Sequence, residues 1–233
     1  MTEHIGPSWP VAVESLVGSG INLGVSDGYS LLPCTIEQAR NFLYVVCRRD
    51  MSDDARAYKV GHSPDPDDAF MFHAMTTGAI DTGGRGYEHV LLDIETLNKH
   101  ALDGGYEVSA VSIHSFPEIS EKYHLMNCGA SMGEGYGPML ITKKIMTVDE
   151  AKKSKIAIPG LGTSAYLALR LAWGDVEVEV VPFDEILPAV YNGEYDVGLI
   201  IHEGQLTWES EGVELLLDLG VWWNEKTGLP LPL

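Results

Sequence analysis

His202 stands at the end of the apolar run Val197–Ile201, where a buried strand would stop. An imidazole partly removed from water at this point would be neutral near pH 7 and could accept a proton as a general base. A structural histidine bonded to the backbone would account for the same residue. The sequence has no G-x-S-x-G motif, which disfavours a serine hydrolase.

The segment Gly160–Ala165 could bind an anion. Its glycines would let the backbone approach a ligand, and Thr163 and Ser164 would offer hydroxyls and N–H groups at the start of a helix. A carboxylate or a phosphate would suit such a position. A plain Ser/Thr helix cap explains the same residues, and both interpretations stay open.

Three aspartates, Asp65, Asp67 and Asp68, invite a calcium interpretation. A calcium loop beginning at Asp65 needs Gly at its sixth position and Glu at its twelfth, but the chain has Phe70 and Thr76 there. These carboxylates either cap a helix or line a cleft. The eight histidines have no H-E-x-x-H or clustered spacing, so we expect no metal.

The cysteines Cys34, Cys47 and Cys128 lie far apart and form no C-x-x-C pair. Free thiols, no basic and apolar leader at the N-terminus and no apolar run of about 20 residues together predict a cytoplasmic protein. Cys47 or Cys128 could be a nucleophile, but a small buried residue is the commoner role of a lone cysteine.

The chain has 233 residues and a formal net charge of −19. The acidic excess is concentrated in residues 171–233, where Lys226 is the single basic side chain. Such a surface repels nucleic-acid phosphates and anionic lipid headgroups, so we expect neither nucleic acid nor membrane as a partner. The pattern says nothing about oligomeric state.

From Ala57 onward, short apolar runs alternate with amphipathic segments that stop at glycine, which is typical of an α/β protein with parallel strands. In such sheets, ligands bind beyond the carboxyl ends of the strands. The expected strands are Ala57–His62, Tyr87–Asp93, Glu107–Ile113, Pro138–Thr142, Lys155–Pro159, Val176–Val181 and Asp196–Ile201, and the expected helices are Asp67–Thr77, Ile94–Asp103, Thr163–Trp173 and Asp184–Asn192.

Several motifs resemble the 1,4-dihydroxy-6-naphthoate synthase family of menaquinone biosynthesis by the futalosine route. The resemblance runs from about Val60 to the last residue. Its motifs are Ser63-Pro64-Asp65-Pro66-Asp67-Asp68-Ala69-Phe70, Asp93-Ile94-Glu95-Thr96-Leu97-Asn98, Gly135-Tyr136-Gly137-Pro138, Ile200-Ile201-His202-Glu203, and Asp218-Leu219-Gly220 with Trp222-Trp223 and Thr227–Leu233.

The resemblance implies a two-lobed, type II periplasmic-binding-protein-like fold that holds its ligand between the lobes. It implies a lyase that converts cyclic dehypoxanthine futalosine to 1,4-dihydroxy-6-naphthoate without metal or organic cofactor. The catalytic base would be His202. The substrate-binding residues would be Ala110, Val111 and Ser112 in one lobe and Thr163, Ser164 and Ala165 in the other.

The chain departs from the family at Asp65, Asp67 and Ala110, where relatives have Cys, Asn and Lys; the changes at Asp67 and Ala110 make the pocket more negative. We expect residues 57–137 and 228–233 to form a first lobe that lacks its C-terminal part, and residues 138–227 to form a second lobe. Residues 1–56 read as an extension or linker without assigned role. A non-catalytic binding protein for a small carboxylated solute is the alternative function, and a related chorismate dehydratase is a weaker one.

Overall fold

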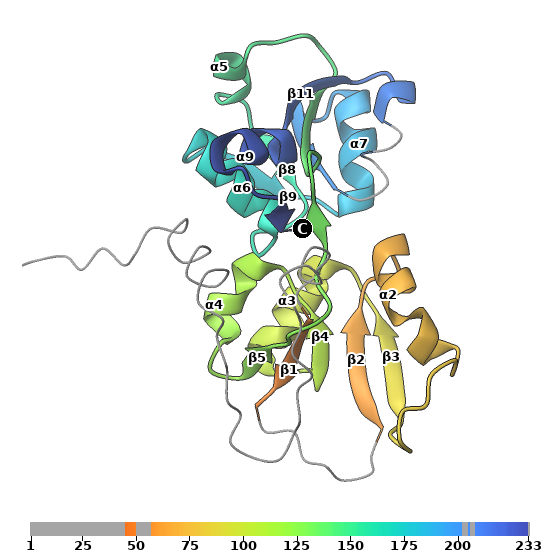
Figure 1. The fold of residues 1–233 in the computed structure, drawn as a ribbon. Helices are drawn as coiled ribbons and strands as arrows, with labels where there is room; N and C mark the ends of the chain where they lie inside the picture. Colours follow the sequence, from red (N-terminus) through yellow and green to blue (C-terminus); the bar gives the residue numbers. More distant parts are fainter. Residues whose placement is uncertain (1–44, 50–56, 202–204, 206–207, 233) are drawn as a thin grey trace, which may run out of the picture. The chain divides into compact units, whose positions relative to one another are not determined.

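The computed structural model describes residues 45–49, 57–201, 205 and 208–232. They form two five-stranded sheets and a two-stranded ribbon (Figure 1). We call the first sheet with helices α2 (Pro66–Thr76), α3 (Ile94–Asp103) and α4 (Phe116–Ile119) the first lobe. We call the second sheet with α5 (Val148–Ala151), α6 (Ser164–Trp173), α7 (Phe183–Asn192) and α9 (Leu219–Thr227) the second lobe.

The first sheet has the strand order β3-β2-β4-β1-β5. Strand β2 is parallel to its neighbours β3 and β4, whereas β1 is antiparallel to both β4 and β5. The bounds are β1 Val45–Arg48, β2 Tyr58–His62, β3 Tyr87–Leu91, β4 Val108–Ala110 and β5 Tyr123–Leu125.

The second sheet has the order β11-β7-β10-β8-β9, with β7 antiparallel to its two neighbours and β8 parallel to its own. If the strands of each sheet are numbered one to five along the chain, both sheets have the order 3-2-4-1-5. The two lobes therefore repeat one topology. The bounds are β7 Met139–Thr142, β8 Ile156–Ile158, β9 Val178–Val180, β10 Val197–Ile200 and β11 Glu214–Asp218.

The expected strands and helices are confirmed, each to within about three residues of its expected bounds. The helix stops are glycines in the left-handed region, as at Gly104 and Gly193 with φ of 74° and 79°. Asp93 begins α3 because its side chain accepts the N–H of Thr96. The α/β class that the pattern predicted and the two lobes that the resemblance implied are therefore present.

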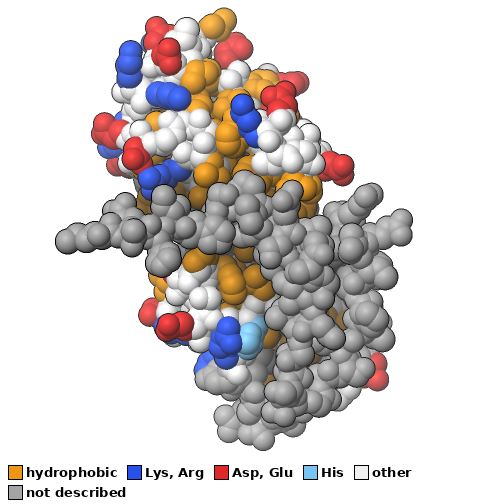
Figure 2. Space-filling view, turned by 60° about the vertical axis from the view of Figure 1, so that its left-hand side comes forward, with side chains coloured by type: hydrophobic (Ala, Val, Ile, Leu, Met, Phe, Trp, Pro, Cys, Tyr) orange, Lys and Arg blue, Asp and Glu red, His pale blue; other side chains and the backbone are white. Residues whose placement is uncertain are grey.

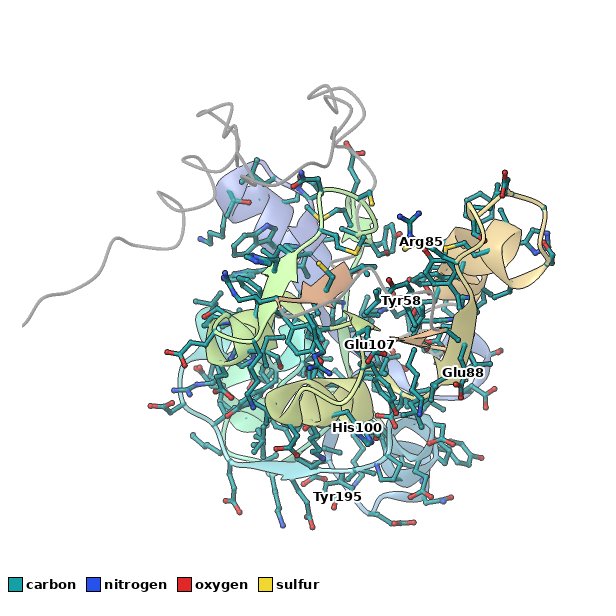
Figure 3. The ribbon with its side chains drawn as sticks, turned by 90° about the horizontal axis from the view of Figure 1, so that it is seen from below. Tyr58, Arg85, Glu88, His100, Glu107 and Tyr195 are labelled. Carbon is teal, nitrogen blue, oxygen red and sulfur yellow. The ribbon has the colours of Figure 1, made fainter. Side chains whose placement is uncertain are left out.

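Strand β1 lies inside the segment 1–56 that we expected to be an extension or linker. It is an interior strand of the first sheet, between β4 and β5, and Val46 is fully buried. Glu107 fixes its end, since its carboxylate pairs with Arg48 at 3.8 Å and accepts the N–H of Lys59 at 2.9 Å. Figure 3 views this end of the sheet and labels Glu107 and Tyr58. Part of the segment is thus structural.

The segment that runs from the first lobe to the second includes β6 (Met132–Gly133), which pairs with β12 (Leu231–Pro232) after α9. A Cβ on Gly220 would lie 2.0 Å from the carbonyl oxygen of Tyr136, so α9 meets this connecting segment backbone to backbone. Leu231 packs into the core of the second lobe, although we had expected residues 228–233 to belong to the first.

Charged side chains of both signs are scattered among hydrophobic and uncharged ones on the face of the second lobe at the top of Figure 2. Surface ion pairs such as Arg170–Asp175 and Lys155–Glu179 join some of them. Within the described ranges, every helix is too short or too polar to span a membrane.

Candidate functional site between two loops

Two loops that follow parallel strands meet across the lobes. The first follows β4 and comprises Ser112–Ser115; the second follows β8 and comprises Gly160–Ser164. The Ser115 hydroxyl donates to the carbonyl of Gly162 at 2.9 Å, and His114 Nδ1 lies 3.1 Å from the carbonyl of Thr163. The loops that carry Ser112 and Thr163 are therefore in contact, and of the six residues that the resemblance placed at a binding site, Thr163 takes part in one of these two contacts.

In the first loop, Ser112 is the residue that the resemblance implies for substrate binding. It is buried, and Asn98 of α3 holds it with two hydrogen bonds: the Ser112 N–H donates to Oδ1 at 2.9 Å, and Nδ2 donates to the Ser112 hydroxyl at 3.2 Å. The side chains of Ala110 and Val111 are fully buried in two core clusters of the first lobe. They can serve a ligand through their backbone alone.

In the second loop, Thr163 is the N-cap of α6. Its hydroxyl accepts the N–H of Tyr166 at 3.2 Å and donates to the carbonyl of Gly160 at 2.8 Å. The cap interpretation of Thr163 is thus confirmed. Ser164 differs, because its buried hydroxyl oxygen has no hydrogen-bond partner among the described residues. Ala165 packs into the second-lobe core.

The glycines of the second loop are required by the side chains of the first lobe. A Cβ on Gly160 would lie 2.2 Å from the carboxyl carbon of Glu95, and one on Gly162 would lie 2.8 Å from the Ser115 hydroxyl. The Gly162 N–H donates to Glu95 Oε2 at 3.2 Å. Sequence reasoning missed Glu95, Asn98 and Ser115 as site residues, although the first two belong to the quoted Asp93–Asn98 motif.

His202, the expected base, and Glu203 lie outside the described residues. The strand that precedes them, β10, is buried along its length and parallel to β8. Its carboxyl end therefore lies at the same edge of the sheet as the loop that begins at Gly160.

The aspartate turn after β2 is held by hydrogen bonds to Ser63. Asp68 Oδ2 accepts the Ser63 N–H at 2.6 Å, and Asp65 Oδ2 accepts the Ser63 hydroxyl at 2.5 Å. Asp65 precedes α2 without a side-chain cap hydrogen bond. Within the described ranges, no three His, Cys, Asp or Glu side chains gather as a metal site needs.

His62, just before this turn, is buried and pairs with the half-buried His89 of β3. His62 Nδ1 lies 2.9 Å from the carbonyl of Ser63, and its Nε2 lies 3.0 Å from His89 Nδ1. Phe72 stacks on the His62 ring at 4.3 Å. Burial lowers the pKa of both imidazoles, and the neighbouring His89 lowers that of His62 further. The pair is therefore neutral near pH 7.

The two cysteines among the described residues, Cys47 and Cys128, differ in exposure. Cys47 of β1 is half-buried, and burial raises the pKa of its thiol, which makes it a poor nucleophile. Cys128 is exposed, contrary to the expectation of a buried small residue. Cys34 lies outside the described residues.

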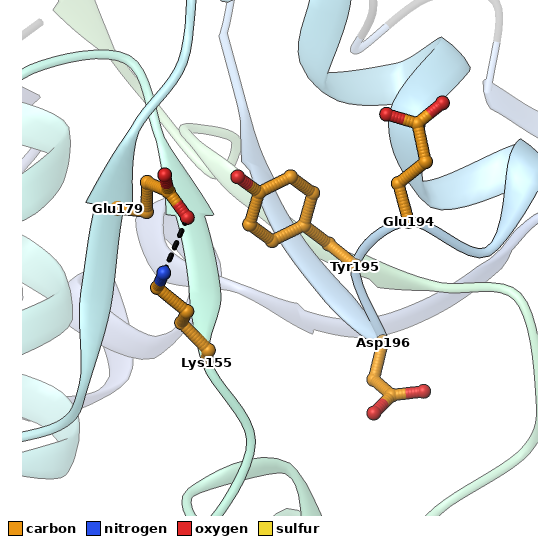
Figure 4. A pocket seen from close by; sticks show the side chains of 5 residues that line it. All are labelled: Lys155, Glu179, Glu194, Tyr195 and Asp196. Atoms are coloured by element: carbon orange, nitrogen blue, oxygen red, sulfur yellow. Dashed lines mark ion pairs between the residues drawn. The ribbon is translucent and has the colours of Figure 1, made fainter.

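A separate pocket of about 330 Å³ lies at the other end of the second sheet (Figure 4). Lys155 precedes β8 and Asp196 precedes β10, so the pocket is at the amino ends of these strands. Lys155 Nζ pairs with Glu179 Oε2 at 2.5 Å, and a hydrogen bond to Glu179 raises the pKa of Tyr195. Ligands of parallel sheets bind at the opposite ends of the strands. We therefore interpret this pocket as a surface depression around an ion pair and not as the ligand site.

Comparison with known proteins agrees with the fold. A protein from Archaeoglobus fulgidus, known from a crystal structure, is 45% identical to this chain and superposes on it with a TM-score of 0.72. The match covers 78% of this chain and 67% of the Archaeoglobus chain. The alkanesulfonate-binding protein SsuA of Xanthomonas axonopodis pv. citri is 14% identical, with a TM-score of 0.56. Here the match covers 72% of this chain and 62% of the SsuA chain. This likeness shows the type II periplasmic-binding-protein-like fold alone.

Two curated relatives are 1,4-dihydroxy-6-naphthoate synthases, from Thermus thermophilus and Streptomyces coelicolor. They are 40% identical over 178 residues and 34% identical over 185 residues, which is 76% and 77% of this chain. The chain spans 64% of the length of each. The family model described as menaquinone biosynthesis matches residues 58–233. With its two lobes and the loops that meet between them, this chain belongs to the menaquinone biosynthesis family.

Proposed function

We propose that this chain is a lyase that converts cyclic dehypoxanthine futalosine to 1,4-dihydroxy-6-naphthoate. The observation that carries the proposal is the contact between the Ser112–Ser115 and Gly160–Ser164 loops, in a chain that is 40% identical to a 1,4-dihydroxy-6-naphthoate synthase. Both loops follow carboxyl ends of parallel strands, where ligands of such sheets bind.

The substrate's carboxylate would bind at the start of α6. The N–H groups of the first helical turn have no acceptor within the helix, and the helix dipole favours negative charge there. Ser164 adds a buried hydroxyl that has no partner among the described residues, so it can donate to a ligand. Ser112, held by Asn98, would bind the ligand from the first lobe.

His202 would act as general base. Its imidazole follows a buried strand, and an imidazole with a pKa near 6.5 is a stronger base at neutral pH than a solvated carboxylate. The other parts of the proposal are a cytoplasmic location, no nucleic-acid or membrane partner, and independence from metal and organic cofactors.

The direct test is incubation of the chain with cyclic dehypoxanthine futalosine, with naphthoate formation followed by chromatography. The expected result is conversion that survives dialysis against a chelator. Loss of activity with the chelator and its recovery with zinc or magnesium would contradict the metal-free reaction. Binding of the substrate without turnover would contradict the lyase and support the alternative, a solute-binding protein.

A further inference from the structure

Glu95 places a carboxylate of the first lobe against the start of a helix in the second. Glu95 Oε2 accepts the N–H of Gly162 at 3.2 Å, and Glu95 as a whole is only 8% exposed. Gly162 precedes Thr163, the N-cap of α6. A Cβ on Gly160 would overlap the same carboxyl group, so this loop has no room for both a side chain and Glu95.

The Glu95 carboxylate has few hydrogen-bond and ion-pair partners for a buried charged group. Among the described residues its interactions are the Gly162 hydrogen bond and an ion pair with Lys99 Nζ at 3.5 Å. The Lys99 side chain is 64% exposed, so solvent weakens that pair. Burial of a carboxylate is costly unless it is well paired, and the dipole of α6 supplies part of the compensation.

Glu95 thus lies beside the start of α6, where an external anion would also be favoured. The Ser164 hydroxyl, two residues beyond Gly162, is buried and has no partner among the described residues, so the loop can still donate to a further group. Two carboxylates at one helix start would repel each other, and their mutual repulsion is large where water is excluded. An anionic ligand and Glu95 therefore compete.

We propose that Glu95 is an internal ligand of the Gly160–Ser164 loop, which a carboxylated ligand displaces when it binds. The proposal rests on the proposed function for the identity of that ligand. In the ligand-free protein, Glu95 links the lobes through Gly162. On binding, the ligand's carboxylate replaces it, and Glu95 turns toward Lys99 and solvent. Glu95 thus sets the affinity for anions without taking part in the reaction.

The first arm of the test needs no ligand. Hydrogen exchange of the Gly162 amide is compared between the parent and Glu95→Ala, with Asp103→Asn as the control, because Asp103 is an exposed carboxylate on the same helix. We expect Gly162 to exchange about tenfold faster in Glu95→Ala and to be unchanged in the control. Equal exchange in Glu95→Ala and the parent overturns the proposal.

The second arm measures calorimetric binding of 1,4-dihydroxy-6-naphthoate. Glu95→Gln keeps the shape and an acceptor oxygen but removes the charge, so we expect about tenfold tighter binding, equivalent to about 1.4 kcal/mol. Asp103→Asn, with the same change of net charge, should bind as the parent does. Unchanged or weaker binding by Glu95→Gln overturns the displacement, because Glu95 would then be inert or would hold the ligand.

Circular dichroism and thermal melting verify that each variant is folded, and Glu95→Met, which has a side chain of similar length without an acceptor oxygen, takes the place of Glu95→Ala in the first arm if the alanine variant is not. The two proposals fail differently. If the parent neither converts the cyclic futalosine nor binds the naphthoate, the proposed function is overturned. The Gly162 exchange rates then decide the role of Glu95 alone, with faster exchange supporting the internal ligand and equal exchange overturning it.

Discussion

Asn98 and Ser112 hold each other through two hydrogen bonds in opposite directions, between a helix and the loop that follows a neighbouring strand. Both residues are buried. The amide of Asn98 thereby fixes the position of the Ser112 hydroxyl and satisfies its N–H. This pair gives the loop that follows β4 a defined geometry.

Replacement of Asn98 by Ala should therefore affect both stability and binding. It leaves the buried N–H of Ser112 without its acceptor, which costs about 1–3 kcal/mol. We expect kcat/KM for naphthoate formation to fall about tenfold, mainly through KM, because Asn98 positions a binding group and not the base. The control is Asn192→Ala, at an exposed position at the end of α7. An Asn98→Ala enzyme with unchanged KM would contradict this role.

Strand β1 should be essential to the first lobe. Val46 is fully buried between β4 and β5, and Val46→Ala removes two methyl groups and leaves a cavity. At about 0.8 kcal/mol per buried CH₂ with a further cavity penalty, we expect a loss of about 2 kcal/mol in the free energy of unfolding in urea. Val148→Ala, at an exposed position in α5, should change it little. Equal stabilities would show that β1 contributes little to the sheet.

The same strand shows why the sequence did not predict the whole fold. Elements such as α3 and α7 combine an apolar face with a glycine stop, and local sequence is enough to identify them. The four residues of β1 have no such pattern, and their place depends on pairing with residues about sixty positions later, in β4. Strand β11 and helix α9 were missed as well, because Glu214–Asp218 does not alternate and α9 carries few buried side chains.

The site residues also fall into some that the sequence could suggest and others that it could not. Thr163 could be expected from its position after an apolar run, because the ends of parallel strands are known ligand positions, whereas Ser112 was named through the family resemblance. Glu95 and Ser115 act through contacts with Gly162, which is 67 and 47 residues away along the chain. Such long-range contacts leave no periodicity in the sequence. The glycines at 160 and 162 were noticed, but not the side chains that require them.

The His62–His89 pair should make stability depend on pH. Burial lowers the pKa of both imidazoles in the folded chain, whereas in the unfolded chain their pKa values are near 6.5. The folded state therefore favours the neutral form. This contribution is fully present above about pH 6.5 and is lost as the pH falls through the lowered folded pKa values.

Replacement of His62 by Asn tests this pH dependence. The Asn side chain can still donate to the carbonyl of Ser63 but cannot titrate in this range. We expect His62→Asn to be less stable than the parent at pH 7.5, and its stability to fall less between pH 7.5 and 5 in urea unfolding. His73→Asn, at an exposed position in α2, is the control and should retain the parent's pH dependence. A parallel loss of stability in His62→Asn and the parent would contradict the explanation.

His202→Asn tests the base of the proposed reaction. The mechanism needs a proton to be removed from carbon or from a sugar hydroxyl, and loss of a general base costs about 10²–10⁴ in rate. Asn has similar size and polarity, so substrate affinity should change far less than turnover. Activity of the parent should also fall as the pH drops through the pKa of this imidazole, because protonation removes its lone pair. Single-turnover kinetics with the cyclic futalosine and calorimetric binding separate the two effects, with His73→Asn as the control. Turnover of His202→Asn within about tenfold of the parent would make His202 a structural residue and leave the lyase without its base.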